Sequence, residues 1–300
     1  MVRINKILCP VDFFPASRRA ADYAIALAKA YESKLILLHV VSPVLPASYE
    51  IPINAADILE SMTNAADNEM KKLAARAQAK KVDAEVIVHT GEIDLEIRSL
   101  VKDLNVDFIV MGTHGRRGFE KWFLGSVTER LLRRVDVPVL TIGSIANGTK
   151  APNAIRRILV TTDFSEGTGD AIRYAFSIGQ EYQANVTLMH VLNDISGDIS
   201  GRYRDTLIKS IRTELEDLVP DDARDWCDVS TRVETGLPWT RILDTAKRDK
   251  IDLVVMNVHG NGMLHRALVG STAERVVRGS PAPVLLIPPA ALGKRKKKAA

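Results

Sequence analysis

A glycine-rich segment in the middle of the chain has the residue types and spacing to bind a small anion. Residues 106–111 form an apolar run that reads as a buried strand, and residues 127–135 read as an amphipathic helix. Gly112, Gly115 and Gly125 lie between the two. Glycine permits backbone conformations and close approaches that a side chain would block. Because a helix start adds free N–H groups and the positive end of the helix dipole, the segment predicts a phosphate cradle.

The second half of the chain repeats this construction. The apolar run 253–256 is followed by Asn257, at the position where the first copy has its first glycine. Gly260 and Gly270 come next, with the same nine-residue separation as the last two glycines of the first copy. A loop this long, repeated at one spacing, indicates a duplicated unit.

A carboxylate follows the first predicted strand of each copy, at Asp12 and at Asp163. Ligands of open parallel sheets bind beyond the carboxyl ends of the strands. If the first predicted strand (residues 4–11) and the fourth (residues 106–111) are neighbours in the sheet, the carboxylate and the phosphate cradle share one crevice. The carboxylate would then accept hydrogen bonds from a ribose hydroxyl or an adenine amino group, which is the role we favour for Asp12. The alternative is that the aspartate only stabilises the turn that follows it.

One serine directly follows the last glycine of each loop, and each serine has two predicted roles. Ser126 precedes Glu129 by three residues, and Ser271 precedes Glu274 by three, which is the capping-box pattern. Capping explains the serines and glutamates but not the glycines upstream of them. We therefore expect each serine to cap its helix and also to reach a phosphate oxygen.

Two common nucleotide-binding motifs are missing from the sequence, and the histidines are weaker candidates for ligand contacts than the glycines. The sequence contains no G-x-x-x-x-G-K-[ST] motif, and no G-x-G-x-x-G follows the first strand, so a P-loop and a dinucleotide fingerprint are both excluded. His39 and His190 lie at the ends of apolar strands, which favours packing roles. His114 and His259 lie in the glycine loops and are candidates for phosphate contacts.

Composition points to an ordinary globular protein of about two domains. The 300 residues are 46% hydrophobic and 26% charged, and the low aromatic content of 5% argues against a stacking platform for single-stranded nucleic acid. The basic tail 294–298 carries more positive charge than the net +4 of the chain, so the rest is close to neutral.

Cys9 and Cys227 provide neither a disulfide framework nor a metal site. No apolar run reaches the ~20 residues of a membrane helix, so no membrane association and a cytoplasmic location are expected.

Predicted strands and helices alternate five times in each half. This pattern is typical of a doubly wound α/β domain with a five-stranded parallel sheet and helices on both faces. The strands are apolar throughout, which fits a sheet covered on both sides. The predicted organisation is a first domain at 1–145, a linker at 146–154, a second domain at 155–290 and a disordered basic tail at 291–300.

Taken together, these features resemble a tandem member of the universal stress protein family. The family motif G-x2-G-x9-G-[ST] is met by Gly112, Gly115, Gly125 and Ser126. The resemblance extends over nearly all of residues 4–288 and includes the aspartate after the first strand and the final Val-Pro-Val-Leu strand. It implies the Rossmann-like fold of adenine-nucleotide alpha-hydrolases in each half.

The resemblance also implies a ligand, ATP or the related ADP or AMP, with Mg²⁺ as an accompanying ion. In the first domain it assigns to the ligand site Pro10, Val11, Asp12, Val40, Met111, Gly112, Gly115, Gly125, Ser126 and Val127. In the second domain it assigns Thr161, Thr162, Asp163, Val191, Met256, Gly260, Gly270, Ser271 and Thr272. Asn257 departs from the motif, and its side chain takes space beside the ligand, so weaker or absent binding is expected in the second site.

The function implied is a nucleotide-binding stress-response or signalling module. One alternative is an ATP-hydrolysing enzyme, but hydrolysis needs a placed base or a metal-held nucleophile, and only Asp12 and Asp163 are candidates, so at most slow turnover is expected. Another alternative is a nucleotide-free interaction module, against which the complete glycine spacing of the first domain argues. The family further implies pairing of sheets through the last strand, which the two copies could satisfy within one chain, with a homodimer as a further expectation. Nucleic acid is not an expected partner.

Overall fold

The computed structural model describes residues 2–42, 55–113, 125–143, 155–165, 167–193, 201–258 and 269–288. The predicted linker at 146–154 and the predicted basic tail at 291–300 lie outside these residues. None of the helices within the described ranges is both long and apolar enough to cross a membrane.

The first half alternates strands and helices in the predicted order. Its elements are β1 (Lys6–Pro10), α1 (Pro15–Ala30), β2 (Lys34–Val41), α2 (Ala55–Gln78), β3 (Ala84–Thr90), α3 (Ile93–Asp103), β4 (Phe108–Gly112), α4 (Ser126–Leu132) and β5 (Val139–Ile142). Helix α1 begins at Pro15, where the missing N–H of proline has no intrahelical partner to lose.

The second half repeats the same order with one short 3₁₀ helix added. Its elements are β6 (Arg157–Thr162), α5 (Thr168–Tyr182), β7 (Asn185–Leu192), α6 (Gly201–Asp217), η1 (Ala223–Asp225), β8 (Val229–Thr235), α7 (Pro238–Arg248), β9 (Leu253–Asn257), α8 (Ser271–Gly279) and β10 (Val284–Ile287).

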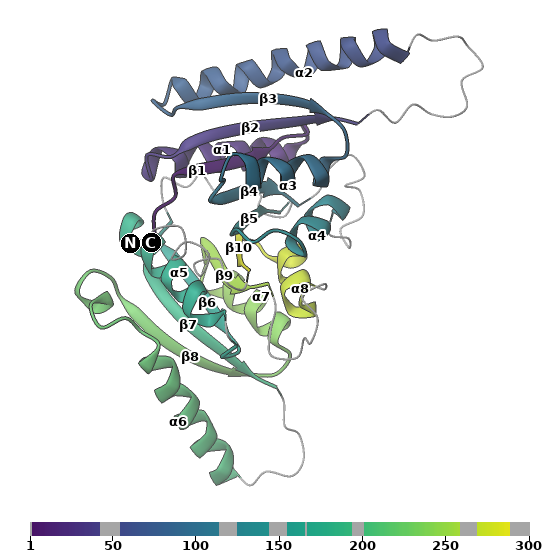
Figure 1. The fold of residues 1–300 in the computed structure, drawn as a ribbon. Helices are drawn as coiled ribbons and strands as arrows, with labels where there is room; N and C mark the ends of the chain where they lie inside the picture. Colours follow the sequence, from purple (N-terminus) through teal and green to yellow (C-terminus); the bar gives the residue numbers. More distant parts are fainter. Residues whose placement is uncertain are drawn as a thin grey trace.

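All ten strands join in one sheet, in the order β3-β2-β1-β4-β5-β10-β9-β6-β7-β8 (Figure 1). Within each half the neighbouring strands are parallel. The halves meet through β5 and β10, which pair antiparallel with Leu140 opposite Leu285. The Thr141 hydroxyl adds a 3.0 Å hydrogen bond to the Val284 carbonyl. The α/β fold is confirmed, and the expected pairing through the last strand occurs within the chain.

The sheet separates two hydrophobic layers, because successive side chains of a strand point to opposite faces. In β1, Ile7 and Cys9 belong to one cluster and Leu8 to the other. The first cluster includes residues of α1, α2, α5 and α6, and the second includes residues of α3, α4, α7 and α8. Each cluster contains residues of both halves, so the two domains share both hydrophobic layers.

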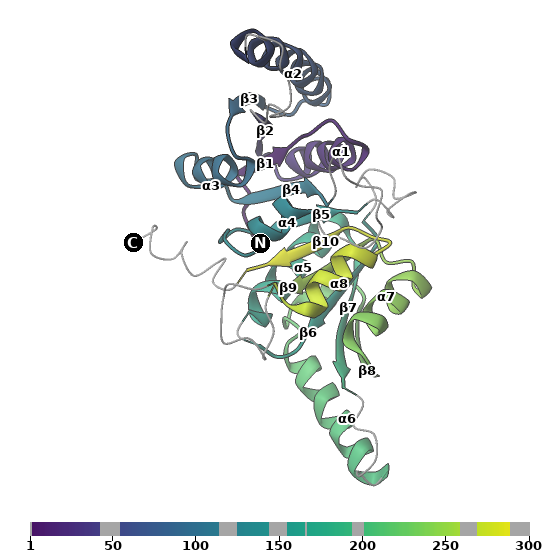
Figure 2. The same ribbon diagram turned by 90° about the vertical axis from the view of Figure 1, so that its right-hand side faces the viewer.

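Helices α2 and α6 lie over the two outer ends of the sheet and extend past it (Figure 1 and Figure 2). Helix α2 is anchored in the core from Ala66 onward. Met70 and Ala77 are fully buried there, whereas Met62, two turns earlier, is 40% exposed. The 24 residues of α2 span about 36 Å, which is longer than the strands that it covers.

Candidate functional site

The predicted crevice lies at the carboxyl ends of β1 and β4. These strands are neighbours, with Ile7 opposite Phe108. Asp12 therefore follows one strand at the same edge of the sheet where Gly112 ends the other. The first and fourth strands are therefore neighbours, as a shared site for a carboxylate and a phosphate requires.

Gly112 brings the start of α1 directly against the end of β4. A Cβ atom at this position would lie 2.8 Å from the Ala16 carbonyl carbon and 2.8 Å from the Ser17 nitrogen. Real Cβ atoms do not approach backbone atoms so closely. Any other residue here would push the helix away from the strand, so glycine is required for this close packing.

The two ends of the glycine loop are joined by the backbone. The Gly125 N–H donates a 2.9 Å hydrogen bond to the Thr113 carbonyl, and a Cβ on Gly125 would lie only 2.6 Å from that oxygen. The Thr128 hydroxyl donates a 3.3 Å bond to the Gly112 carbonyl. The start of α4 is therefore held on the end of β4.

The second domain closes its loop in the same way. The Gly270 N–H donates to the Val258 carbonyl at 2.9 Å. The loop residues between these closures, including Gly115, Gly260 and the histidines His114 and His259, lie outside the described residues.

The predicted capping boxes are wrong. Ser126 and Ser271 are the first helical residues, and the residues before them, Gly125 and Gly270, occupy the N-cap positions without a side-chain cap. The backbone closure of the loop draws the glycine to the helix start, which moves the serine into the first turn. Glu129 instead pairs with Arg133, and Glu274 pairs with Arg278 at 3.6 Å. The serine hydroxyls are therefore not engaged in caps.

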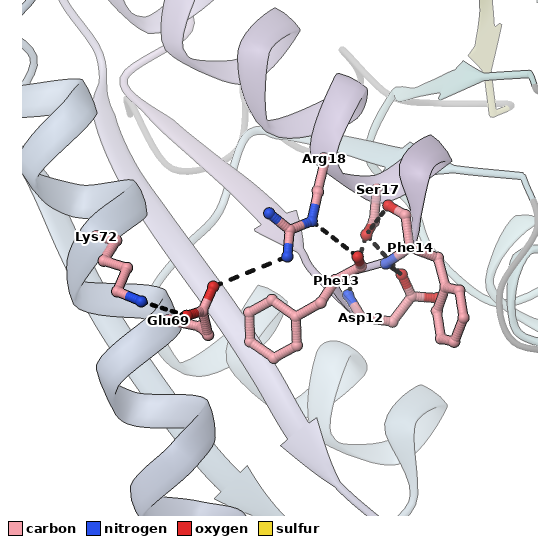
Figure 3. Close-up of polar contacts among 7 residues, drawn as sticks. All are labelled: Asp12, Phe13, Phe14, Ser17, Arg18, Glu69 and Lys72. Atoms are coloured by element: carbon pink, nitrogen blue, oxygen red, sulfur yellow. Dashed lines mark hydrogen bonds and ion pairs between the residues drawn. The ribbon is translucent and has the colours of Figure 1, made fainter.

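Asp12 does stabilise the turn that follows it (Figure 3). Its Oδ1 accepts hydrogen bonds from the Phe14 N–H at 3.0 Å and from the Ser17 hydroxyl at 2.5 Å. Both of these bonds use Oδ1, so Oδ2 still has acceptor capacity for another group. The turn role and the ligand role proposed for Asp12 are therefore compatible. The sequence analysis did not identify Ser17 as part of this turn.

In the second domain the hydroxyl at the position of Ser17 has a different hydrogen-bond partner. The Ser165 N–H donates to Asp163 Oδ1 at 3.1 Å, matching the Phe14 bond of the first domain. Thr168, which replaces Ser17, lies 2.8 Å from the Thr162 hydroxyl rather than on the aspartate. The side chain of Thr162 thus takes part in the turn.

A strained phenylalanine follows each aspartate. Phe13 has φ 65° and Phe164 has φ 59°, in the left-handed region that bulky residues rarely adopt. Phe13 stacks on His39 with ring centroids 4.6 Å apart, and Phe164 lies 4.9 Å from His190. Since the same outlier occurs in both copies, the stack holds the turn that carries the aspartate. The predicted packing role of the two histidines is confirmed.

Each histidine also binds the backbone of the neighbouring strand end. His39 Nδ1 lies 2.7 Å from the Val11 carbonyl, and His190 Nδ1 lies 2.9 Å from the Thr162 carbonyl. In the first domain, Arg18 Nε donates to the Phe13 carbonyl at 2.8 Å and its guanidinium lies 3.8 Å from Glu69 of α2 (Figure 3). These contacts connect the aspartate turn to β2 and to α2.

The remaining predicted site residues divide between the two faces of the sheet. Those packed in the cluster on the α3, α4, α7 and α8 side are Val40, Met111, Val127, Val191 and Met256. Val11 is 4% exposed and packs in the opposite cluster, so its side chain is a core residue. Thr161 is 7% exposed, Pro10 ends β1 and Thr272 lies in the first turn of α8. The predicted residues therefore gather at the carboxyl edge, but not all present a side chain to it.

Comparison with known proteins identifies the family. The model of the Universal stress protein family matches residues 3–143 and, separately, residues 154–288. The chain belongs to the universal stress protein family. A universal stress protein of Methanocaldococcus jannaschii is 30% identical over 141 residues, covering 45% of this chain and 83% of that protein. A second relative, the universal stress protein YxiE of Bacillus subtilis, is 30% identical over 146 residues, covering 46% of this chain and 98% of its own length.

Solved structures resemble the whole tandem arrangement. A universal stress protein from Archaeoglobus fulgidus superposes with a TM-score of 0.72 at 24% identity, covering 96% of this chain and 97% of that one. One described as a putative universal stress protein from Pseudomonas aeruginosa has a TM-score of 0.64 at 18% identity, with 99% of this chain covered and 98% of that chain. At these identities the likeness concerns the fold, and it extends over both Usp domains.

Proposed function

We propose that the first Usp domain binds ATP or a related adenine nucleotide, and that the bound state makes the protein a stress-response or signalling module. The observation that carries this proposal is the construction at Gly112 and Gly125. Both positions lack room for a Cβ atom. Together they hold the starts of α1 and α4 against the end of β4, which neighbours the strand that Asp12 follows.

The chemistry of this edge supports an anionic nucleotide. The start of α4 offers free N–H groups and the positive end of its dipole for phosphates. The Ser126 hydroxyl is not used as a cap, which leaves it for a phosphate oxygen. Asp12 Oδ2 would accept a hydrogen bond from the ribose or from adenine. An accompanying Mg²⁺ would be held mainly by the phosphates and by water, as is usual for this ion.

Equilibrium binding of ATP to the purified chain tests the proposal. Gly125→Trp is expected to weaken binding at least tenfold, because the side chain would displace the start of α4 from the end of β4. Gly270→Trp makes the same change in the second domain and serves as the matched control. Equal losses in both variants, or a wild-type chain that binds no nucleotide, would contradict the assignment to the first domain.

The nucleotide that copurifies with the chain distinguishes the alternatives. After denaturation, anion-exchange chromatography of the supernatant is expected to show ATP. Recovery of ADP or AMP would favour a hydrolysing enzyme. A chain that is free of nucleotide and also fails to bind ATP would favour a nucleotide-free interaction module.

A further inference from the structure

The crevice of the second domain differs from the first by a paired exchange of residues. Asn257 occupies the position of Gly112, and Gly167 occupies the position of Ala16. In the first domain the glycine is on the strand and the larger residue on the helix start. In the second domain the order is reversed.

The Asn257 side chain connects the end of β9 to the start of α5. Its neighbours fix the orientation of the amide, with the nitrogen toward the Gly167 carbonyl at 3.0 Å and the oxygen toward the Thr168 N–H at 3.1 Å. The same oxygen accepts a 3.3 Å hydrogen bond from the Ser165 hydroxyl. Three hydrogen bonds therefore join the end of β9 to the turn that begins α5.

Gly167 makes this arrangement possible. A Cβ on Gly167 would lie 3.0–3.1 Å from Cγ and the two terminal atoms of the Asn257 amide. A larger residue at position 167 would therefore force the amide to shift by a few tenths of an ångström. Each domain therefore has its own pair of complementary residues at this position, Gly112 with Ala16 in the first and Asn257 with Gly167 in the second.

We propose that the Asn257–Gly167 bridge closes the second crevice to nucleotide, so that each chain binds one nucleotide, in its first domain. This inference rests on the proposed function of the first domain. A ligand entering the second crevice would have to displace the Asn257 amide and break its hydrogen bonds to Gly167, Thr168 and Ser165. The Gly167 carbonyl and the Thr168 N–H also have backbone partners in this turn, so what opposes binding is the volume of the amide and the loss of its own hydrogen bonds.

The number of ATP molecules bound per chain, measured by equilibrium titration of the full chain, tests this inference. The wild type is expected to bind one. The double variant Asn257→Gly with Gly167→Ala restores the first-domain pair and is expected to bind two. The reciprocal variant Gly112→Asn with Ala16→Gly builds the bridge in the first domain and is expected to bind none. Circular dichroism establishes that each variant is folded, and Asn257→Gly alone replaces the double variant if that variant does not fold.

Introducing Asn257→Gly and Gly167→Ala into a Gly125→Trp variant shows which domain contains the additional site. That background is expected to bind no ATP, and adding Asn257→Gly with Gly167→Ala is expected to restore one. A wild type that binds two, or a folded restored variant that still binds one, would overturn the inference while leaving the proposed function intact. A wild type that binds none would overturn the proposed function and the inference with it.

Discussion

At the scale of single residues, the positions that matter most in the crevice are those without side chains. Gly112 and Gly125 each allow a helix start to touch the end of the same strand. Phe13 acts in the opposite way, since its side chain holds a backbone conformation that it would not adopt alone. The aspartate turn is thus shaped by packing around it as much as by its own hydrogen bonds.

Replacing Gly112 by alanine is expected to lower the free energy of unfolding by about 1–3 kcal/mol, because the new methyl group overpacks against the backbone of α1. Gly169 is the matched control, since a Cβ there meets nothing within 4 Å in the first turn of α5. Gly169→Ala is expected to raise stability by roughly 0.5–1 kcal/mol. Denaturant unfolding of the two variants measures both effects, and a Gly112→Ala variant as stable as the wild type would refute the close contact.

At the scale of elements, the two domains join their equivalent helices with different chemistry. In the first domain, Asp94 of α3 has a side chain that is only 5% exposed, and its Oδ1 lies 3.5 Å from Arg130 of α4. In the second domain, Trp239 takes the place of Asp94, and Arg275 lies 5.3 Å above its ring. The arginine is common to both copies, but its partner is a carboxylate in one and an aromatic face in the other.

Arg130→Ala is expected to cost about 1–3 kcal/mol of stability, because it removes a cation from a buried carboxylate and leaves Asp94 with Arg98, which lies 3.7 Å away. Arg275→Ala is expected to cost only about 0.5–1 kcal/mol, since Trp239 needs no counter-charge. Chemical denaturation at neutral pH provides both values. Arg130→Lys keeps the charge and should recover part of the loss, whereas equal costs at the two positions would argue against the buried carboxylate as the cause.

At the scale of the whole molecule, the two domains pack along α1 and α5 as well as through the sheet. The Val2 N–H donates a 2.9 Å hydrogen bond to the Ser177 hydroxyl in α5. Burial raises the pKa of Tyr31, at the end of α1, well above its ordinary value, and nearby Tyr182 of α5 raises it further, while Ser177 acts in the opposite direction. Burial and then Glu181 likewise raise the pKa of Tyr182. The two tyrosines occupy equivalent positions of the repeat.

These raised pKa values predict a loss of stability in alkaline solution. Below the ordinary tyrosine pKa of about 10, both states are protonated and the contribution is complete. Above it the unfolded chain ionises first, so stability falls by up to about 1.4 kcal/mol per pH unit for each tyrosine. The Tyr31→Phe, Tyr182→Phe double variant is expected to show a shallower decline. Unfolding free energies measured on both sides of that pH test this, and identical slopes for variant and wild type would refute it.

The order of strands and helices could be predicted from the sequence because it depends on local periodicity, and the duplication because both copies keep the same spacing. The turn at Asp12 and the position of Gly112 at the same edge of the sheet could be predicted for the same reason, whereas their role as a ligand site stays a prediction. The capping boxes could not be judged locally, because whether Ser126 or Gly125 occupies the N-cap depends on a hydrogen bond to Thr113 across the loop.

The amino-acid sequence by itself determined the fold class, the two copies and the edge of the sheet where a ligand would bind. Only the tertiary structure decided that β5 pairs with β10 of the same chain, that Arg130 reaches a buried carboxylate, and that Asn257 is matched by Gly167. The members of these pairs are separated by at least 36 positions in the sequence. Their contacts arise only when the sheet brings the strand ends and helix starts together, and neither spacing nor periodicity encodes that approach.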